Sequence, residues 1–278
     1  MIAGWLKGKP VVATVRDFKF LCPLALCFIS HKRCTWHRFI NEEISQYQKR
    51  YGGAGRFKLI LAKLWQYQLK WWLNRCRQVI CVSPQLEKIY RDNGVRRTTA
   101  IYNLPPLKQP QATGNNILSV GKISYGKGSD MIIAAASRLP QLQFVFAGEL
   151  NPSLKPDWPP NCRYLGKISH ARVLKLFTRA GVFVINSRWP EPLSRAGLEA
   201  LSFGLPIVAS NRGGNQELIK ENGVLVDPEN PGAVAAAIEK AARQKNWPKN
   251  SHSLLVTRFN RRQIIKSHLD LYRSLCCK

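Results

Sequence analysis

Beyond residue 116, short apolar runs of the chain alternate with longer segments in which apolar residues recur at helical spacing. The apolar runs predict strands at residues 117–123, 143–149, 162–168, 182–186, 206–210 and 223–227. The segments between them predict helices at residues 130–139 and 170–180, after Ser194, and at residues 232–244, which Asn230 and Pro231 introduce. Apolar strands that alternate with helices are typical of a parallel sheet with helices on both faces. The pattern therefore predicts a doubly wound, Rossmann-like α/β domain, whose ligands bind at the carboxyl ends of the strands.

The first part of the chain shows the same alternation less regularly. It predicts strands at residues 10–15, 79–83 and 100–106, and helices at residues 57–76 and 83–94. Ser83 is the expected N-cap of the second helix, and Gly94 is its expected C-terminal stop. A linker rich in Pro, Gln and Asn follows at residues 107–116. We therefore expect a partial N-terminal α/β domain over residues 1–106, a complete domain over residues 107–257, and a C-terminal helix within residues 258–278 that packs toward the N-terminal domain.

The net charge of the chain is +27, from 43 Lys and Arg against 16 Asp and Glu, and both halves share the excess. Such a surface predicts polyanionic partners: nucleic acid, anionic lipid headgroups or phosphorylated substrates. Nucleic acid ranks last, because no recognition motif accompanies the charge. No run of 18 apolar residues occurs, so we expect no transmembrane helix, and the first residues do not resemble a signal peptide.

The eight cysteines follow no regular framework, which is typical of reduced thiols in a cytoplasmic protein. Cys22, Cys27 and Cys34 lie near His31 and His37, but their spacing matches no common zinc pattern. We therefore favour structural or incidental cysteines over a metal site.

Three loops fall at the expected ligand-binding edge of the second domain. The first runs from Gly121 to Gly128 and contains Lys122 and Lys127. Its glycines let the backbone approach a ligand, and its two lysines suit a pair of phosphates. The spacing differs from that of a Walker A loop. Taken alone, such a turn is more often plain solvated surface.

The second loop precedes the helix for which Ser194 is the expected N-cap. A diphosphate near Leu193–Arg195 would meet the amides of the helix start, its dipole and the Arg195 side chain. Glu191 and Glu199 would repel a diphosphate, so we expect them to accept hydrogen bonds from neutral hydroxyl groups instead. Two glutamates at this spacing also arise by chance, so the pair alone is weak evidence. The third loop, residues 211–217, contains Gly213 and Gly214 and is equally well explained as a simple turn.

In combination and order, these segments resemble the nucleotide-sugar-binding domain of the retaining glycosyltransferases of family four, which have the GT-B fold. The family's Gly-Arg…Lys-Gly loop is similar to residues 121–128, and its Glu-seven-residues-Glu motif is similar to residues 191–199. Its Gly-Gly-x-x-Glu turn is similar to residues 213–217, and its Gly-x-Leu-Val-x-Pro segment is similar to residues 223–228. The resemblance implies a GT-B-like fold and a nucleotide-diphosphate sugar as the donor substrate.

The resemblance also implies roles for individual residues. Lys122 and Lys127 would bind the diphosphate, and with Glu191, which would contact the transferred sugar, they are the catalytic candidates. Glu199 would hold the ribose hydroxyls. The remaining donor-binding candidates are Gly121, Lys167, Ile168, Leu193, Ser194 and Arg195. Fixed charges would stabilise the leaving nucleotide, so we expect neither a metal nor another cofactor. The resemblance also implies retention of anomeric configuration.

Two departures from the family pattern concern the donor loop and the first domain. The family usually has Arg where Lys122 stands, so the bidentate fork of a guanidinium is lost. Residues 10–15 resemble a strand in the middle of the family's first domain. The segments that precede this strand in the family, among them a Gly-rich acceptor loop, have no counterpart here. Arg16 stands where the family often has His. We therefore expect an intact donor half and an incomplete acceptor half.

The predicted helix at residues 57–76 mixes Trp and Lys with aliphatic residues. This composition suits an anionic membrane surface, but it suits equally a buried helix whose lysines extend outward to water. Our first hypothesis is a cytoplasmic glycosyltransferase, peripheral at the inner membrane face, with a lipid-linked or envelope saccharide as acceptor. The alternative is a fragment or partner subunit that binds a nucleotide-sugar without turnover.

Overall fold

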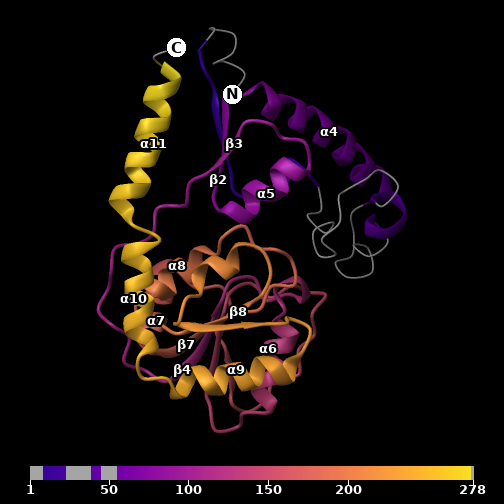
Figure 1. Cartoon of the computed structure of the whole chain (residues 1–278). Coiled ribbons are helices and arrows are strands. Elements are labelled where there is room, and N and C mark those ends of the chain that lie inside the picture. Colours follow the sequence, from indigo (N-terminus) through magenta and orange to yellow (C-terminus); the bar gives the residue numbers. More distant parts are fainter. Residues whose placement is uncertain (1–8, 23–38, 45–54, 277–278) are drawn as a thin grey trace. The chain divides into compact units, whose positions relative to one another are not determined.

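The computed structural model describes residues 9–22, 39–44 and 55–276, which form two compact units (Figure 1). One unit comprises residues 1–104 together with residues 261–278, and the other comprises residues 105–260. Cys27, Cys34, His31 and His37 lie outside the described residues, whereas Cys22 is a buried free thiol. Among the described residues, no helix combines the length and the apolar character that a membrane span requires.

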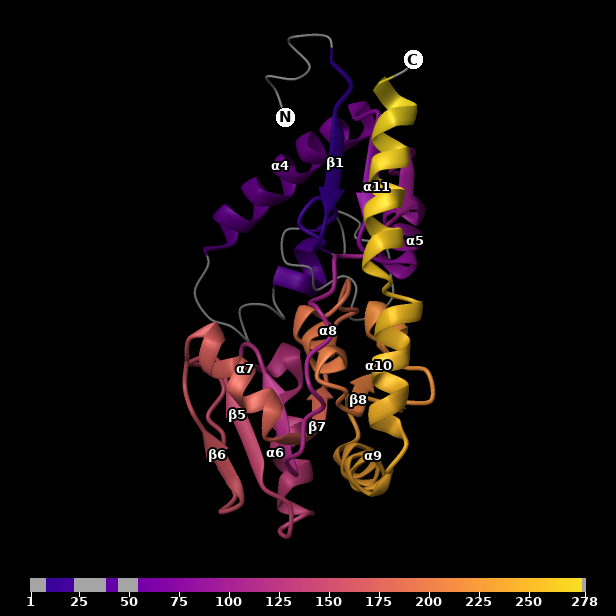
Figure 2. The same cartoon turned by 90° about the vertical axis from the view of Figure 1, so that its left-hand side faces the viewer.

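The unit of residues 105–260 is built on a six-stranded sheet in the order β6-β5-β4-β7-β8-β9, and all neighbouring strands are parallel (Figure 2). The strands are β4 (Asn116–Val120), β5 (Phe144–Ala147), β6 (Cys162–Tyr164), β7 (Ala180–Ile185), β8 (Ile207–Ser210) and β9 (Gly223–Val226). Several strands end earlier than the apolar runs predict. The remaining residues of those runs, including Lys122 and Lys167, form the loops at the carboxyl edge of the sheet.

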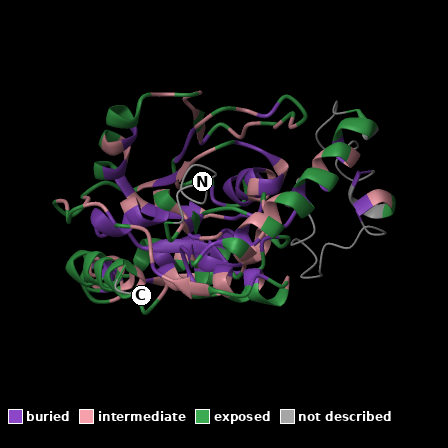
Figure 3. Ribbon diagram, turned by 90° about the horizontal axis from the view of Figure 1, so that it is seen from above, coloured by how far each residue is buried: buried purple, intermediate pink, exposed green. Residues whose placement is uncertain are grey.

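Helices cover both faces of this sheet, as the alternating pattern predicts. One face carries α6 (Ser129–Ser137) and α9 (Pro231–Arg243), whose Ile132, Val234 and Ile238 pack on buried strand residues. The other face carries α7 (His170–Thr178), α8 (Arg195–Ser202) and α10 (Trp247–Thr257). Figure 3 shows the buried residues concentrated on the strands and the exposed ones on the outer surfaces of the helices. The sequence pattern did not indicate α10.

Glycines make the sharp turns at the carboxyl edge. Gly128 ends the short 3-10 helix η3 (Tyr125–Lys127) with φ 63°, and a Cβ atom there would lie 2.1 Å from the carbonyl oxygen of Asn186. Gly213 has φ 58° and precedes η4 (Gly214–Leu218), and a Cβ atom there would lie 2.5 Å from the carbonyl oxygen of Glu191. A side chain fits neither position, so both turns require glycine.

The other unit contains a three-stranded parallel sheet in the order β1-β2-β3. Its strands are β1 (Val12–Val15), β2 (Gln78–Cys81) and β3 (Thr98–Ala100). Its helical elements are η2 (Phe39–Glu43), α4 (Arg56–Arg75), α5 (Pro84–Asp92) and α11 (Arg261–Cys276). The prediction of a strand at residues 100–106 is wrong, because β3 ends at Ala100, and Pro105 and Pro106 cannot donate to a ladder. Ile264 of α11 packs on Ile80 and Ile101.

Helix caps follow the sequence prediction. Ser83 accepts a hydrogen bond from the amide of Leu86, and Pro84 occupies the first turn of α5. Asn230 accepts one from the amide of Ala233 and starts α9. These side chains satisfy amides that a helix start leaves without intrahelical partners.

Of the two interpretations of this helix, the surface of α4 contradicts the buried helix with outward lysines. Phe57, Leu61, Leu64 and Trp65 recur at helical spacing and are exposed, with 71% of Phe57 and 63% of Trp65 open to solvent. In contrast, Lys63 is fully buried and lies over the rings of Phe39 and Tyr67. The helix therefore presents an apolar, aromatic stripe on its outer side.

Candidate functional site

The residues predicted to bind a donor lie in the loops at the carboxyl edge of the six-stranded sheet or in α8, which follows one of these loops. Gly121, Lys122 and Lys127 follow β4, and Lys167 and Ile168 follow β6. Glu191, Leu193 and Ser194 lie between β7 and α8, and Arg195 and Glu199 belong to α8. In a doubly wound sheet this edge is the usual place for a ligand.

The carboxylate of Glu191 is the best-connected group of the site. Its Oε1 atom forms an ion pair with Lys127 Nζ and accepts hydrogen bonds from Ser187 Oγ at 2.7 Å and from Trp189 Nε1 at 2.9 Å. Burial opposes ionisation of Glu191, but the charge of Lys127 and the three hydrogen bonds outweigh it and hold the pKa of Glu191 below its ordinary value. Glu191 is therefore a buried, ionised carboxylate at neutral pH.

The backbone of Glu191 is fixed from the third loop. The amide of Gly214 donates to the carbonyl oxygen of Glu191 at 2.6 Å, and Glu191 and Gly213 form an isolated parallel bridge. The Gly-Gly turn thus supports the position of Glu191. Glu217, which ends the Gly-Gly-x-x-Glu motif, instead places its carboxylate 3.8 Å from Arg258.

The start of α8 has the geometry that the sequence predicts. The Oγ atom of Ser194 accepts a hydrogen bond from the amide of Gly197 at 3.1 Å, so Ser194 is confirmed as the N-cap. Leu193 is buried beneath the turn, and Arg195 is exposed. The amides of Arg195 and Ala196 belong to the first turn, where a helix has no acceptors of its own for its N–H groups.

Glu199 lies one turn into α8 and meets a residue that the sequence did not indicate. His170, the first residue of α7, places its Nε2 atom 2.8 Å from Glu199 Oε1. The Glu199 side chain is only 15% exposed, whereas that of His170 is 66% exposed. The carboxylate is therefore recessed beneath an imidazole that faces solvent.

Arg188 is a second residue whose role the sequence did not indicate. It is 1% exposed, and its guanidinium donates to both carboxylate oxygens of Asp130, at 2.6 and 2.8 Å, and to the carboxylate of Glu229 at 2.9 Å. It also donates to the carbonyl oxygen of Tyr125 and stacks 3.8 Å from the centre of that ring. Burial favours the neutral form, but the hydrogen bonds and charges of Asp130 and Glu229 raise the pKa of Arg188 above its ordinary value.

The contacts of Arg188 join three loops. Tyr125 and Asp130 flank the turn that carries Lys127, Glu229 precedes α9, and Arg188 itself leads into the loop of Glu191. Asn186, two residues earlier, donates to the carbonyl oxygens of Gly128 at 3.5 Å and Pro228 at 3.0 Å. The end of β7 therefore holds the lysine turn and the Glu191 loop in one arrangement.

The structure does not bring every predicted residue into one contact network. Lys127 is paired with Glu191, whereas Lys122, which the sequence grouped with it, is exposed. Lys167 is also exposed, and Ile168 is half-buried. The site thus has a connected centre, at Lys127 and Glu191, and exposed lysines at its margin.

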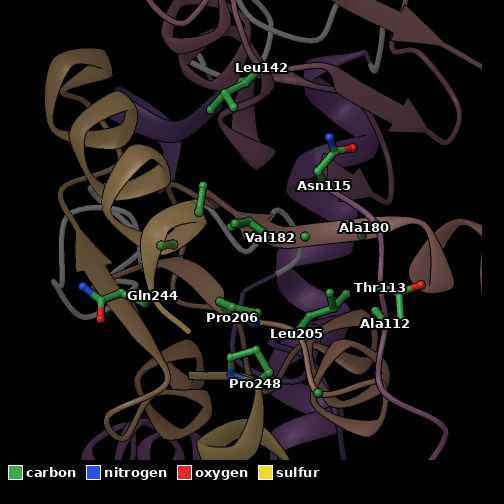
Figure 4. A pocket seen from close by; sticks show the side chains of 15 residues that line it. Ala112, Thr113, Asn115, Leu142, Ala180, Val182, Leu205, Pro206, Gln244 and Pro248 are labelled. Carbon is green, nitrogen blue, oxygen red and sulfur yellow. The ribbon is translucent and has the colours of Figure 1, made fainter. Parts of the chain in front are cut away.

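A cavity of about 300 Å³ lies elsewhere in the same unit (Figure 4). Its lining includes Asn115, Val182, Pro206 and Gln244, at the amino ends of β4, β7 and β8 and the end of α9. None of its lining residues is charged. A diphosphate would find no cationic side chain there, which favours the carboxyl edge as the ligand site.

The two residues that the sequence did not indicate differ in how they might have been found. Arg188 begins the Arg-Trp-Pro-Glu segment. Its pairing with Asp130 and Glu229 cannot be predicted from the sequence, because only the fold brings these two carboxylates to it. His170 follows Ser169, the N-cap of α7, so it stands at a predictable helix start. Its partner lies 29 residues away on another helix, and no local spacing links the two.

Comparison with known proteins establishes the family. A sequence profile of the family described as Glycosyl transferases group 1 matches residues 107–253, more than half of the 278 residues. The chain therefore belongs to this family.

The chain is 30% identical over 180 residues to spore coat protein SA of Bacillus subtilis, a match that covers 56% of this chain and 48% of that protein. It is 31% identical over 147 residues to the glycogen synthase of Mycobacterium tuberculosis, covering 47% of this chain and 34% of the synthase. The chain thus matches half or less of the length of these two relatives.

Solved structures confirm the predicted GT-B fold. A structure of HepE from Anabaena in complex with UDP and glucose aligns with a TM-score of 0.70, at 19% identity, over 99% of this chain and 74% of HepE. Sucrose-phosphate synthase from Thermosynechococcus elongatus aligns with a TM-score of 0.71, at 22% identity, over 99% of this chain and 71% of the synthase.

We expect Arg188→Met to lower the free energy of unfolding by about 3 kcal/mol, because it leaves the Asp130 carboxylate without the guanidinium that donates to both of its oxygens. Arg243→Met is the matched control, since the Arg243–Glu239 pair is exposed and its loss should cost less than about 0.5 kcal/mol. Chemical unfolding followed by circular dichroism measures both. Equal losses in the two variants would show that Arg188 does not anchor the loops.

Proposed function

We propose that the carboxyl edge of the six-stranded sheet binds a nucleotide-diphosphate sugar, and that the protein transfers this sugar to a saccharide acceptor with retention of configuration. The observation that carries the proposal is the ion pair between Lys127 and the buried Glu191, formed beside the start of α8. This pair supports the proposal because a cation suits a diphosphate and an ionised carboxylate suits the hydroxyl groups of a sugar.

The diphosphate is assigned to Lys127, with Lys122 and the amides of Arg195 and Ala196. A diphosphate carries more charge than one carboxylate, so it competes well for the Lys127 ammonium group. The helix start adds N–H donors and the positive end of the helix dipole. These fixed groups stabilise the charge that develops on the leaving nucleotide, which is the role that a bound cation has in other transferases.

Glu191 is assigned to the transferred sugar. Its three hydrogen bonds all go to Oε1, and we assign Oε2 to a hydroxyl group of the sugar. An ionised, buried carboxylate forms a stronger hydrogen bond to a hydroxyl than an exposed one does. Glu199 is assigned in the same way to the ribose hydroxyls, and the backbone near Lys167 and Ile168 to the base.

In the proposed reaction, the bond between the anomeric carbon and the diphosphate oxygen breaks. An acceptor hydroxyl forms the new bond to that carbon from the same face, and its proton passes to the departing diphosphate. Each bond that breaks is replaced, and no oxidant or cofactor is consumed. The HepE complexes, which contain UDP, UDP-glucose or glucose, support a uridine nucleotide as the first candidate donor.

We expect Lys127→Ala and Glu199→Ala each to weaken UDP binding by roughly 10- to 100-fold, because each removes a hydrogen bond to a charged group. Glu191→Gln should mainly weaken UDP-glucose relative to UDP, since Glu191 is assigned to the sugar. Calorimetric titration with UDP, ADP, GDP and UDP-glucose measures these constants.

Lys175→Ala provides the control for these variants, because Lys175 is an exposed lysine on α7. It should leave all four constants unchanged. If the parent chain is folded and binds none of the nucleotides, or if all variants bind like the parent, the proposed function is wrong. Nucleotide binding without release of nucleotide diphosphate from any nucleotide-sugar would favour a binding subunit over a transferase.

We further propose that the acceptor is lipid-linked and that the stripe on α4 contacts an anionic membrane at the cytoplasmic face. The support is the exposed row of Phe57, Leu61, Leu64 and Trp65 in a chain of net charge +27. Aromatic and aliphatic residues enter the headgroup boundary, and basic residues are attracted to anionic lipids.

We expect the double variant Leu61→Ser, Trp65→Ser to bind vesicles of phosphatidylcholine and phosphatidylserine at least about tenfold more weakly, because two large apolar side chains no longer enter the bilayer. The control pair Leu269→Ser, Tyr272→Ser removes exposed apolar residues of α11 and should bind like the parent. Vesicle co-sedimentation measures both. Equal binding by the parent and the α4 variant would exclude α4 as the membrane contact.

A further inference from the structure

We infer that His170 is a positioning residue for the Glu199 carboxylate, and through it for the ribose of the donor. This inference rests on the proposed function, which assigns Glu199 to the ribose hydroxyls. The observation behind it is the 2.8 Å contact between His170 Nε2 and Glu199 Oε1, which joins the first residue of α7 to a residue one turn into α8.

The backbone of His170 is held in place by its own helix. Ser169 caps α7 by accepting a hydrogen bond from the amide of Arg172, and Val173 and Phe177 are buried against the rest of the unit. The ring of Phe177 contacts that of Phe183 of β7 in a tilted arrangement and stacks on that of Phe203. The imidazole therefore extends from a fixed point, and its reach to Glu199 is set by the packing of α7.

The Glu199 backbone is fixed as well. The Ser194 cap defines the start of α8, and Leu198, the residue before Glu199, is buried. A glutamate side chain on a fixed helix still has several rotamers. A hydrogen bond from His170 to Oε1 selects one of them and leaves Oε2 to accept from a ribose hydroxyl. Holding the carboxylate before the ligand arrives removes part of the entropic cost of binding.

The exposure of the two side chains suits this division of roles. The Glu199 side chain is recessed, with 15% of its surface exposed, whereas that of His170 is 66% exposed. Because His170 is largely exposed, its substitution does not disturb a core. A change in ligand affinity in a His170 variant can therefore be separated from a change in folding.

The test compares UDP with 2′,3′-dideoxy-UDP, which lacks the hydroxyls assigned to Glu199. We expect His170→Ala to weaken UDP binding by about three- to tenfold and to leave the dideoxy analogue unchanged. His170→Gln, whose side-chain amide can also donate to Glu199, should restore most of the affinity for UDP. The control Lys175→Ala removes an exposed cation from the same helix and should have no effect on either ligand.

A double-mutant cycle with Glu199 completes the experiment. In a Glu199→Ala background, His170→Ala should cause no further loss of UDP affinity, because its effect acts through the missing carboxylate. Equal losses for UDP and its dideoxy analogue, or additive losses in the cycle, would overturn the inference. If Lys127→Ala and Glu199→Ala weaken UDP binding and His170→Ala does not, the inference alone fails. If the folded parent binds no nucleotide, the proposed function and the inference fail together.

Discussion

The geometry of the candidate site depends on the hydrogen bonds and ion pairs that the buried guanidinium of Arg188 forms. It is charged, almost wholly excluded from water, and bonded to two carboxylates and one carbonyl group that come from two other loops. A buried charge is tolerable only while those partners stay in place, so the loops are coupled energetically to one another. The turn of Lys127 and the segment of Glu191 are therefore held in one arrangement by shared contacts. A site built in this way has its charges placed before a ligand arrives.

The remaining contacts divide the site into two parts with different chemistry. At Lys127 and Glu191 a partly exposed cation is paired with a buried anion, which suits a charged diphosphate beside a sugar hydroxyl. At Glu199 and His170 a recessed carboxylate meets an exposed imidazole, which suits neutral hydroxyls that approach from solvent. The start of α8 lies between the two parts, since Glu191 precedes it and Glu199 follows it by one turn. Each of the two glutamates already accepts a hydrogen bond from its own partner, Glu191 from Lys127 and Glu199 from His170.

Much of this arrangement could be predicted from the sequence. The alternation of apolar runs and helical segments is local, and it predicted the parallel sheet and its two helical faces. Capping is also local, so Ser83 and Ser194 were predicted as N-caps correctly. The prediction of a strand at residues 100–106 was wrong because the pairing of β3 ends at Ala100, although the apolar run continues beyond it. The outward face of α4 could not be predicted either, because its composition suits a buried helix and an exposed one equally.

The side-chain pairs within the site could not be predicted from the sequence, for a different reason. Nothing near Arg188 in the chain indicates that Asp130 and Glu229 will surround it, because the fold brings these loops together. The same holds for His170 and Glu199, which lie on separate helices. Sequence patterns predicted which loops reach the carboxyl edge, and tertiary packing determined which side chains meet there. The roles of those side chains in binding a donor stay predictions that ligand measurements must decide.

The location of the donor is the central claim, and hydrogen exchange read by mass spectrometry tests it most directly. The amides of residues 121–129 and 187–199 should exchange more slowly when UDP-glucose is added. A bound diphosphate accepts hydrogen bonds from amides of these two loops and reduces their local opening. The amides of residues 112–115, 204–206 and 241–248, around the uncharged cavity at the amino ends of the strands, should exchange as before. Slowed exchange at that cavity with unchanged exchange at the two loops would contradict the account.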